Sequence, residues 1–128
     1  MTSFSEYKEI ARGRGALAFE VYVVTSRPLV PPEEFSKHLP AHLEYLGEQE
    51  AAGRLMMAGP LSDEAGEGMS GIGFQVWRAS SWNEAKALAE GDPMHVEGVK
   101  QFEMRRWLIN EGRLSLSVGL SGKSIDLG

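Results

Sequence analysis

The sequence contains no cysteine, and this absence removes several kinds of site at once. A disulfide framework, a thiolate nucleophile and a zinc site built on cysteine all need that side chain. Any metal site would therefore depend on the three histidines of the sequence together with carboxylates.

Runs of lysine or arginine are also missing, and the formal net charge is -5, with 18 acidic against 13 basic residues. A polyanion binds to clustered positive charge, so we expect no nucleic-acid partner. Long hydrophobic runs are equally absent. The apolar stretch at residues 16–24 is interrupted by Glu20, is too short to span a membrane, and lacks the flanks of a signal peptide. We expect a cytoplasmic protein with no membrane partner.

What the 128 residues do contain is the composition of an ordinary globular protein, with 42% hydrophobic and 24% charged residues. A chain of this length suits one core. We expect one domain over residues 16–112, preceded by an N-terminal extension at 1–15 and followed by a C-terminal strand or tail extension at 113–128. The segment 1–15 is polar and shows no sustained period, so no structure is predicted for it.

Alternation of apolar residues predicts the first strand over residues 17–24. Prolines close this strand, and Pro32 followed by two glutamates is typical of a helix start. Apolar residues three or four apart continue the helix to a stop at Gly53. Because Pro40 removes a backbone hydrogen bond inside this stretch, we expect a kink or a fresh helix start there.

The next stretch predicts two more strands and a second helix. The strands are expected at residues 54–61 and 72–79, with a polar, glycine-rich connection between them. Ser81 and Glu84 have the spacing of a capping box and predict a helix that ends at Gly91.

The last third of the chain predicts a short helical turn, a fourth strand and an added strand. Asp92 and Pro93 favour the turn, and residues 101–110 favour the strand. Residues 114–120 alternate between apolar and small polar side chains. We expect them to add an edge strand to the sheet or to reach a partner chain.

The predicted order is strand, helix, strand, strand, helix, strand. This is the ferredoxin-like α+β fold, a βαββαβ sandwich with both helices on one face of an antiparallel sheet, here with an extra C-terminal strand. The apolar side chains on the other face of the sheet must then be buried by another surface. Strand positions that could lie on it hold Tyr22, Met56, Trp77 and Trp107. A monomer rarely exposes so much apolar surface, which indicates a homodimer that packs sheet on sheet.

The stretch HLPAHLEYLGEQEAAGRLMMAGPLSD, the glycine-rich turn and strand after it, SSWNEAKALAEGDP and HVEGV together resemble the YCII-related (YciI-like) family. The likeness covers roughly residues 18–106. Its most specific parts are the histidine of Pro-Ala-His-Leu, the Gly-Arg-Leu and Ala-Gly-Pro segments around the second strand, and the Asp-Pro after the second helix. Their order and spacing carry the resemblance.

The resemblance implies a dimer of the dimeric α+β barrel kind, with a catalytic His–Asp pair in a cleft. Matched residue by residue, the pair falls on His42 and Asp92. The family includes a dehydrochlorinase that acts on a chlorinated hydroxyquinol, and it is similar in fold to muconolactone isomerases that need no cofactor. Leu39 departs from the family pattern, which often has a basic residue before Pro-Ala-His-Leu.

Considered as residues alone, His42 and Asp92 each have a structural and a chemical interpretation. His42 flanks the apolar stripe of its helix, where a structural histidine is the commoner outcome. An imidazole also titrates near neutral pH, which suits proton transfer. Asp92 can serve as the N-cap of the turn begun by Pro93, worth about 1 kcal/mol. The roles are compatible, because a capping carboxylate near His42 could also orient its ring.

Three further side chains near this pair are candidates for substrate binding. His38 precedes His42 by four residues, and Tyr45 continues the same face, where it could contact a ligand or a dimer partner. His95 is the third histidine. No metal site is predicted, because the sequence lacks an HExxH motif and Pro40 disturbs the pairing of His38 with His42.

The end of the second strand and the loop after it supply the remaining substrate-binding candidates, Pro60, Ser62 and Asp63. These residues could cover the cleft, and a plain polar turn is the alternative. The nearby glycines do not lead from a strand into a helix with phosphate-binding spacing, so no nucleotide site is predicted.

We therefore predict an enzyme without a cofactor that transfers a proton, by elimination or isomerisation, on a small oxygenated, aromatic or lactone-like metabolite. His42 would be the base or acid and Asp92 its orienting partner. A non-catalytic dimeric module that binds a small molecule is the alternative, and a haem- or oxygen-handling relative is a third option. The expected partners are a small-molecule ligand and further copies of the chain, as a homodimer or a higher even oligomer.

Overall fold

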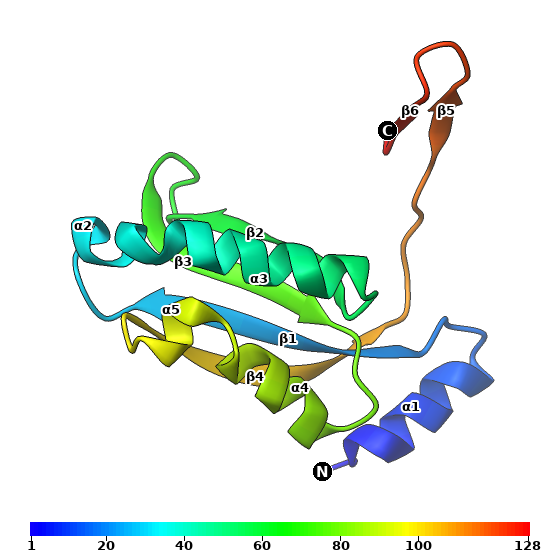
Figure 1. Ribbon diagram of the computed structural model, residues 1–128. Coiled ribbons are helices and arrows are strands. Elements are labelled where there is room, and N and C mark those ends of the chain that lie inside the picture. Colours follow the sequence, from blue (N-terminus) through cyan, green and yellow to red (C-terminus); the bar gives the residue numbers. More distant parts are fainter. The chain divides into compact units, whose positions relative to one another are not determined.

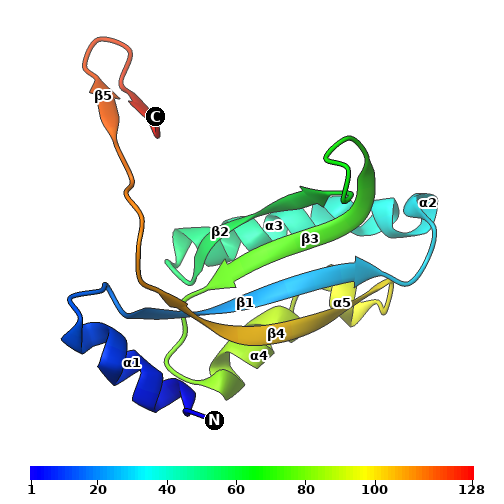
Figure 2. The same ribbon diagram turned by 180° about the vertical axis from the view of Figure 1, so that it is seen from behind.

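The computed structural model describes residues 1–128 and contains a four-stranded sheet in the order β2-β3-β1-β4 (Figure 1). The strands are β1 (Phe19–Pro28), β2 (Leu55–Ser62), β3 (Met69–Trp77) and β4 (Lys100–Ile109). β3 pairs antiparallel with both β1 and β2. β4 runs beside β1 in the opposite direction (Figure 2). The predicted ferredoxin-like topology is therefore confirmed.

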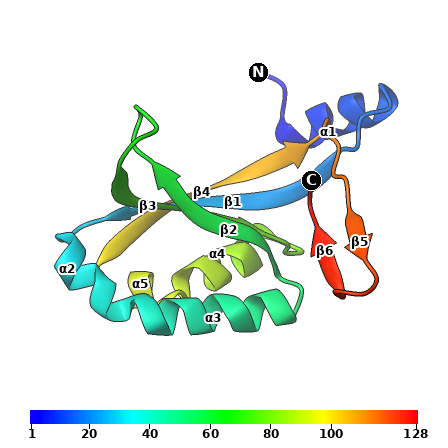
Figure 3. The same ribbon diagram turned by 90° about the horizontal axis from the view of Figure 1, so that it is seen from above.

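Helices cover one face of this sheet, as the view from above shows (Figure 3). They are α2 (Pro32–Phe35), the 3-10 helix η1 (Ser36–His38), α3 (Leu39–Ala51), α4 (Trp82–Glu90) and α5 (Pro93–Val96). The expected interruption near Pro40 is confirmed, because α3 begins as a new helix at Leu39 with that proline in its first turn. Ser81 caps α4 by accepting a hydrogen bond from the Glu84 amide at 3.1 Å.

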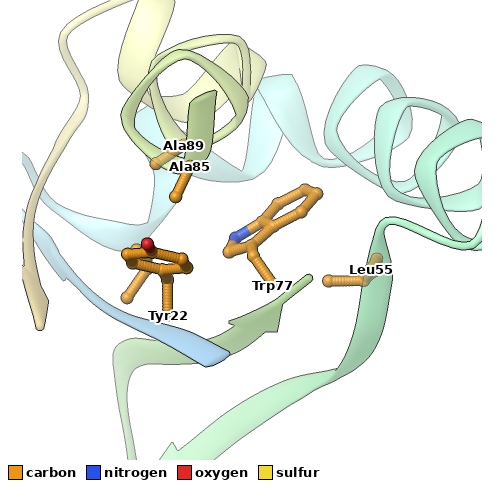
Figure 4. Packing of buried hydrophobic residues seen from close by; sticks show 6 residues of the cluster. Tyr22, Leu55, Trp77, Ala85 and Ala89 are labelled. Atoms are coloured by element: carbon orange, nitrogen blue, oxygen red, sulfur yellow. The ribbon is translucent and has the colours of Figure 1, made fainter. Parts of the chain in front are cut away.

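The hydrophobic core lies between the sheet and the helices. Ala85 and Ala89 of α4 face the rings of Tyr22 and Trp77, with Leu55 beside them (Figure 4). Tyr22 of β1 and Trp77 of β3 are register partners. Both are almost fully buried.

The prediction that Tyr22 and Trp77 lie on the other face of the sheet is therefore wrong. Alternation groups the residues of a strand into two faces, but it does not say which face the helices cover. Trp107 does lie on the face away from the helices, since it alternates with Phe102 and Met104, which pack on the core. Met56 lies where the β2 register shifts and is half-buried.

Two compact units divide the chain, one of residues 20–107 and one of residues 1–19 with 108–128. The second unit contains α1 (Phe4–Gly13), in the segment for which the sequence analysis gave no structure. Ser3 and Glu6 form a capping box at its start, with each side chain accepting the other's backbone amide. The spacing of these two residues was a signal for this helix that we did not use.

The C-terminal segment also differs from expectation. Only β5 (Ser117–Gly119) is strand within residues 113–120, and it pairs with β6 (Ser124–Asp126) in a separate two-stranded hairpin. The expected edge strand of the main sheet is therefore absent. A tight turn returns the chain on itself, with Lys123 at φ 51° in the left-handed region, so the strand's backbone groups pair locally.

None of the helices has the length and apolar character needed to cross a membrane.

Candidate active site

A buried carboxylate, Asp92, lies at the centre of the candidate site, at the N-cap of α5. Only 1% of this residue is exposed. Its two oxygens accept hydrogen bonds from Nδ1 of His42 at 2.8 and 2.9 Å, from Nε2 of Gln75 at 2.8 Å and from the Met94 amide at 3.0 Å. Each donor is fixed by a different element, so the carboxylate holds α3, β3 and α5 together.

The charge of Asp92 is stabilised by these donors. Burial by itself raises the pKa of the Asp92 carboxyl, but the His42 and Met94 hydrogen bonds, the His42 charge and the Gln75 amide outweigh it. The pKa of Asp92 is therefore held below its ordinary value. Asp92 is therefore ionised across the pH range in which most enzymes work.

The geometry also assigns the tautomer of His42. A carboxylate accepts and does not donate, so Nδ1 of His42 carries the proton in its bond to Asp92. The other ring nitrogen, Nε2, is the atom left for a ligand. His42 lies on the wall of a cavity, and 20% of its side chain remains exposed. The predicted meeting of His42 and Asp92, which are fifty positions apart, is present in the structure.

Gln75 extends this arrangement into the core. Its Oε1 accepts a hydrogen bond from the indole N–H of Trp77 at 3.0 Å, while its amide nitrogen donates to Asp92. Because an indole can only donate, Trp77 fixes the orientation of the Gln75 amide. The sequence analysis missed Gln75, although a polar residue that shares a strand face with Trp77 was a usable signal once that face is known to be buried.

The cavity beside His42 has a volume of about 590 Å³ and lies between α2, α3 and the sheet. Its walls are mostly apolar, with Phe35, Leu39 and Leu43 from the helices and glycine-rich backbone from β3. This size suits a small organic molecule, and such sites typically combine an apolar lining with a few polar groups. The polar side chains on its lining are Ser26, Ser36, His42, Gln75 and Lys100.

A second histidine, His95, follows Asp92 in α5 and has hydrogen-bond partners of its own. Nδ1 of His95 is 2.7 Å from the carbonyl oxygen of Ala89, and Nε2 is 2.7 Å from Oγ of Ser26. A carbonyl only accepts, so Nδ1 carries the proton and Nε2 of the neutral ring accepts from the Ser26 hydroxyl. His95, a predicted substrate contact, thus reaches the cavity through Ser26, which lines it.

Lys100, at the start of β4, is the one lysine or arginine on the cavity lining, and no aspartate or glutamate lines it. Its Nζ donates to the carbonyl oxygen of Gly71 at 2.7 Å and lies 4.7 Å from the centre of the Phe35 ring. Burial lowers the pKa of Lys100, and the Asp92 carboxylate opposes that shift. The sequence analysis did not select this residue.

Gly71 makes this approach of Lys100 possible. Its φ is 86°, a conformation that favours glycine, and a Cβ there would lie 2.8 Å from Cζ of Phe35. The carbonyl that receives Lys100 and the ring beneath the ammonium therefore depend on the absence of a side chain at this position.

Two of the predicted substrate contacts, Tyr45 and His38, do not line the cavity. Tyr45 donates its hydroxyl to the carbonyl oxygen of Leu88 at 2.8 Å, and its ring lies 6.4 Å from that of Trp77. It therefore faces α4 and the core. His38 ends η1, before α3 begins, so it is not in one continuous helix with His42.

The chain contains no group of three or more histidine, cysteine, aspartate or glutamate side chains that could hold a metal ion.

The predicted substrate contacts at the end of β2 and directly after it fall into two groups. Pro60 lines the cavity, whereas Ser62 and Asp63 are exposed and do not. The Asp63 carboxylate accepts the backbone amides of Glu67 and Gly68 at 3.1 and 3.0 Å, and these bonds lower the pKa of Asp63. Its placement is that of the polar turn we gave as the alternative.

Comparison with known proteins extends the resemblance seen in the sequence. The profile of the YCII-related domain matches residues 18–108. The uncharacterized protein YjpA of Bacillus subtilis (strain 168) is 31% identical over 80 residues, which are 62% of this chain and 87% of that protein.

A solved structure shares the fold. It is 5-chloro-2-hydroxyhydroquinone dehydrochlorinase from Burkholderia phenoliruptrix AC1100, in complex with 2,5-dihydroxybenzoquinone. The TM-score is 0.52 and the sequence identity 24%, over 67% of this chain and 92% of that one.

Proposed function

The chain belongs to the YCII-related domain family, and we propose that it is an enzyme that moves a proton on a small oxygenated, aromatic or lactone-like metabolite. The reaction is an elimination or an isomerisation and uses no cofactor. The observation that carries this proposal is the pairing of His42 with Asp92, because it leaves the second ring nitrogen of His42 on the wall of a mostly apolar cavity.

In this proposal His42 is the general base. Its Nε2 takes a proton from the substrate, and the electrons of the broken bond form a new double bond. In an elimination, the leaving group departs with the electron pair of its own bond. In an isomerisation, His42 returns the proton at another atom. The imidazolium formed in between is stabilised by the Asp92 carboxylate, which also holds the ring in one tautomer.

Two further facts support this reaction class. The solved structure that shares the fold is a dehydrochlorinase, and dehydrochlorination is an elimination. That protein is in complex with 2,5-dihydroxybenzoquinone, and a cavity of about 590 Å³ accommodates a ring of this size. We therefore propose hydroxylated rings as the first substrates to examine.

We further propose that the chain works as a homodimer, or as a higher even oligomer, through the sheet face away from the helices. Met57 exposes half of its surface and Trp107 43%. Val23 of β1 and Met57 of β2 are both register partners of Val76 in β3, which places them on one face of the sheet. Sedimentation of wild type and Trp107→Glu would test this, with a monomeric wild type as the contradicting result.

The enzymatic proposal is tested with a panel of hydroxylated and chlorinated rings and small lactones, incubated with wild type and with His42→Ala. We expect turnover by wild type and a loss of about 10²–10⁴-fold in the variant. His38→Ala is the matched control, because it removes a histidine four residues away that does not line the cavity. Equal rates for wild type and His42→Ala would remove His42 from the mechanism.

A non-catalytic binding module is the second candidate, and the mostly apolar lining of the cavity favours it, since such a lining can hold a ligand without chemistry. Thermal stabilisation of the wild type by a panel member, with no product detected by mass spectrometry, would support this candidate over the enzyme.

A further inference from the structure

The one strongly basic side chain on the cavity, Lys100, is unlike its surroundings. The other lining residues are apolar or neutral, apart from the titratable His42, and the whole chain carries a formal charge of -5. A charged ammonium in an apolar wall loses hydration, and that loss disfavours the charged form unless partners replace the water.

The structure provides only part of what an ammonium needs. Lys100 has three donor hydrogens, and the Gly71 carbonyl accepts one of them. The Phe35 ring offers its π face to the cation at 4.7 Å. No carboxylate oxygen lies within 4 Å of Nζ, so Lys100 is not part of an ion pair, in contrast to Lys37 and Lys86 at the surface.

We infer that the Lys100 ammonium binds an oxyanion of the ligand, so that the cavity selects small ring compounds with one ionised oxygen. The inference deepens the proposed function and rests on it for the reaction that follows binding. The Gly71 carbonyl and the Phe35 ring hold the ammonium in place, and the ligand oxygen supplies the full negative charge that the protein does not place beside it.

This arrangement also suits the proposed chemistry. When His42 removes a proton from a hydroxylated ring or a lactone, negative charge develops on an oxygen of the substrate, as in a phenolate or enolate. An ammonium fixed in a cavity with little water stabilises that charge more than water would. Lys100 and His42 line the same cavity, but only His42 is bonded to Asp92, so the ammonium of Lys100 stays available for a ligand oxygen.

The inference is tested by binding two probes of nearly equal shape, the anion 4-hydroxybenzoate and the neutral 4-hydroxybenzamide, measured by titration calorimetry at one ionic strength. We expect wild type to bind the anion more tightly. Lys100→Met should lower the ratio of the two affinities about tenfold or more, and Lys100→Arg should retain most of it. Lys86→Met is the control, because Lys86 is an exposed lysine of α4 that does not line the cavity.

Retained binding of 4-hydroxybenzamide shows that Lys100→Met still folds around its cavity, and Lys100→Arg separates charge from side-chain length. The inference is overturned if wild type does not prefer the anion. It is also overturned if Lys100→Met and Lys86→Met keep the same preference as wild type.

The same probes separate this inference from the proposed function. His42→Ala should keep the preference for the anion while losing turnover of the panel. Turnover that survives His42→Ala would overturn the proposed function and leave the anion site standing. A preference that vanishes in His42→Ala and persists in Lys100→Met would overturn the assignment of Lys100.

Discussion

His42 and His95 are both tied to the segment around Asp92, since His42 is bonded to its carboxylate and His95 follows it by three residues in α5. Both rings are anchored through Nδ1, but the anchors differ. His42 donates to a buried carboxylate, whereas His95 donates to the carbonyl of Ala89. Nε2 of His42 is left for a ligand, whereas Nε2 of His95 is occupied by Ser26.

The difference shows that the hydrogen-bond partners of a histidine determine which chemical role its ring can take. A carboxylate stabilises an imidazolium through its full negative charge, whereas a carbonyl oxygen offers only a dipole. His42 is therefore equipped to gain a proton, and His95 is equipped to orient the Ser26 hydroxyl. Three experiments test this difference between the two histidines.

Asp92→Asn should have the largest effect, because it makes the anchor of His42 neutral like that of His95. Asparagine is as good an N-cap as aspartate, so α5 should be retained. We expect kcat/KM for a panel substrate to fall by about 10²–10⁴-fold. Steady-state kinetics check this, with the circular dichroism spectrum as the control for folding. A fall of less than threefold would show that the charge of Asp92 does not assist His42.

Ser26→Ala should have a smaller effect, because it releases Nε2 of His95 without touching His42. Loss of this partly buried hydrogen bond should lower the free energy of unfolding by about 1 kcal/mol. Urea denaturation measures it. Turnover should fall far less than in Asp92→Asn, so a loss of equal size in the two variants would contradict the separate roles given to the two histidines.

The smallest effect is expected from pH, which acts on the anchor of His42 and not on that of His95. The pKa of Asp92 is lower in the folded protein than in the unfolded chain. Its contribution to stability is therefore complete above the unfolded pKa, about 3.9, and is lost as the pH falls through the lower folded value.

The measurement is the difference in unfolding free energy between wild type and Asp92→Asn over a pH series. We expect this difference to shrink as the pH falls below about 4, where Asp92 becomes protonated. Ser26→Ala serves as the comparison in the same acid range, because Ser26 is bonded to His95 and not to a carboxylate. A difference for Asp92→Asn that grows as the pH falls below about 4 would contradict the direction of the shift.

Local signals predicted several elements well. Ser81 and Glu84 indicated the start of α4, Asp92 and Pro93 indicated α5, and Pro40 marked the new start of α3. These features depend on residues three or four apart, whose contacts follow from the geometry of one helical turn. The capping box of α1 was of the same kind and was available in the sequence.

Features that depend on which face of the sheet meets the helices were harder to predict. Tyr22 and Trp77 were placed on the wrong face, and Gln75 and Lys100 were not selected at all. Each of these positions lies on a strand, where the sequence pattern is equally consistent with either face.

Periodicity, caps and motifs are carried by neighbouring residues, and they were enough to predict the order of the main strands and helices in residues 20–107 and the family. The resemblance to that family selected His42 and Asp92 as a pair. Three features could be seen only in the folded chain: Nδ1 of His42 is held by Asp92, the Gln75 amide is held by Trp77, and Lys100 is the cation on the cavity lining. The His42–Asp92 and Lys100–Gly71 contacts join residues far apart in the chain, and the Gln75–Trp77 bond depends on which face of β3 the helices cover.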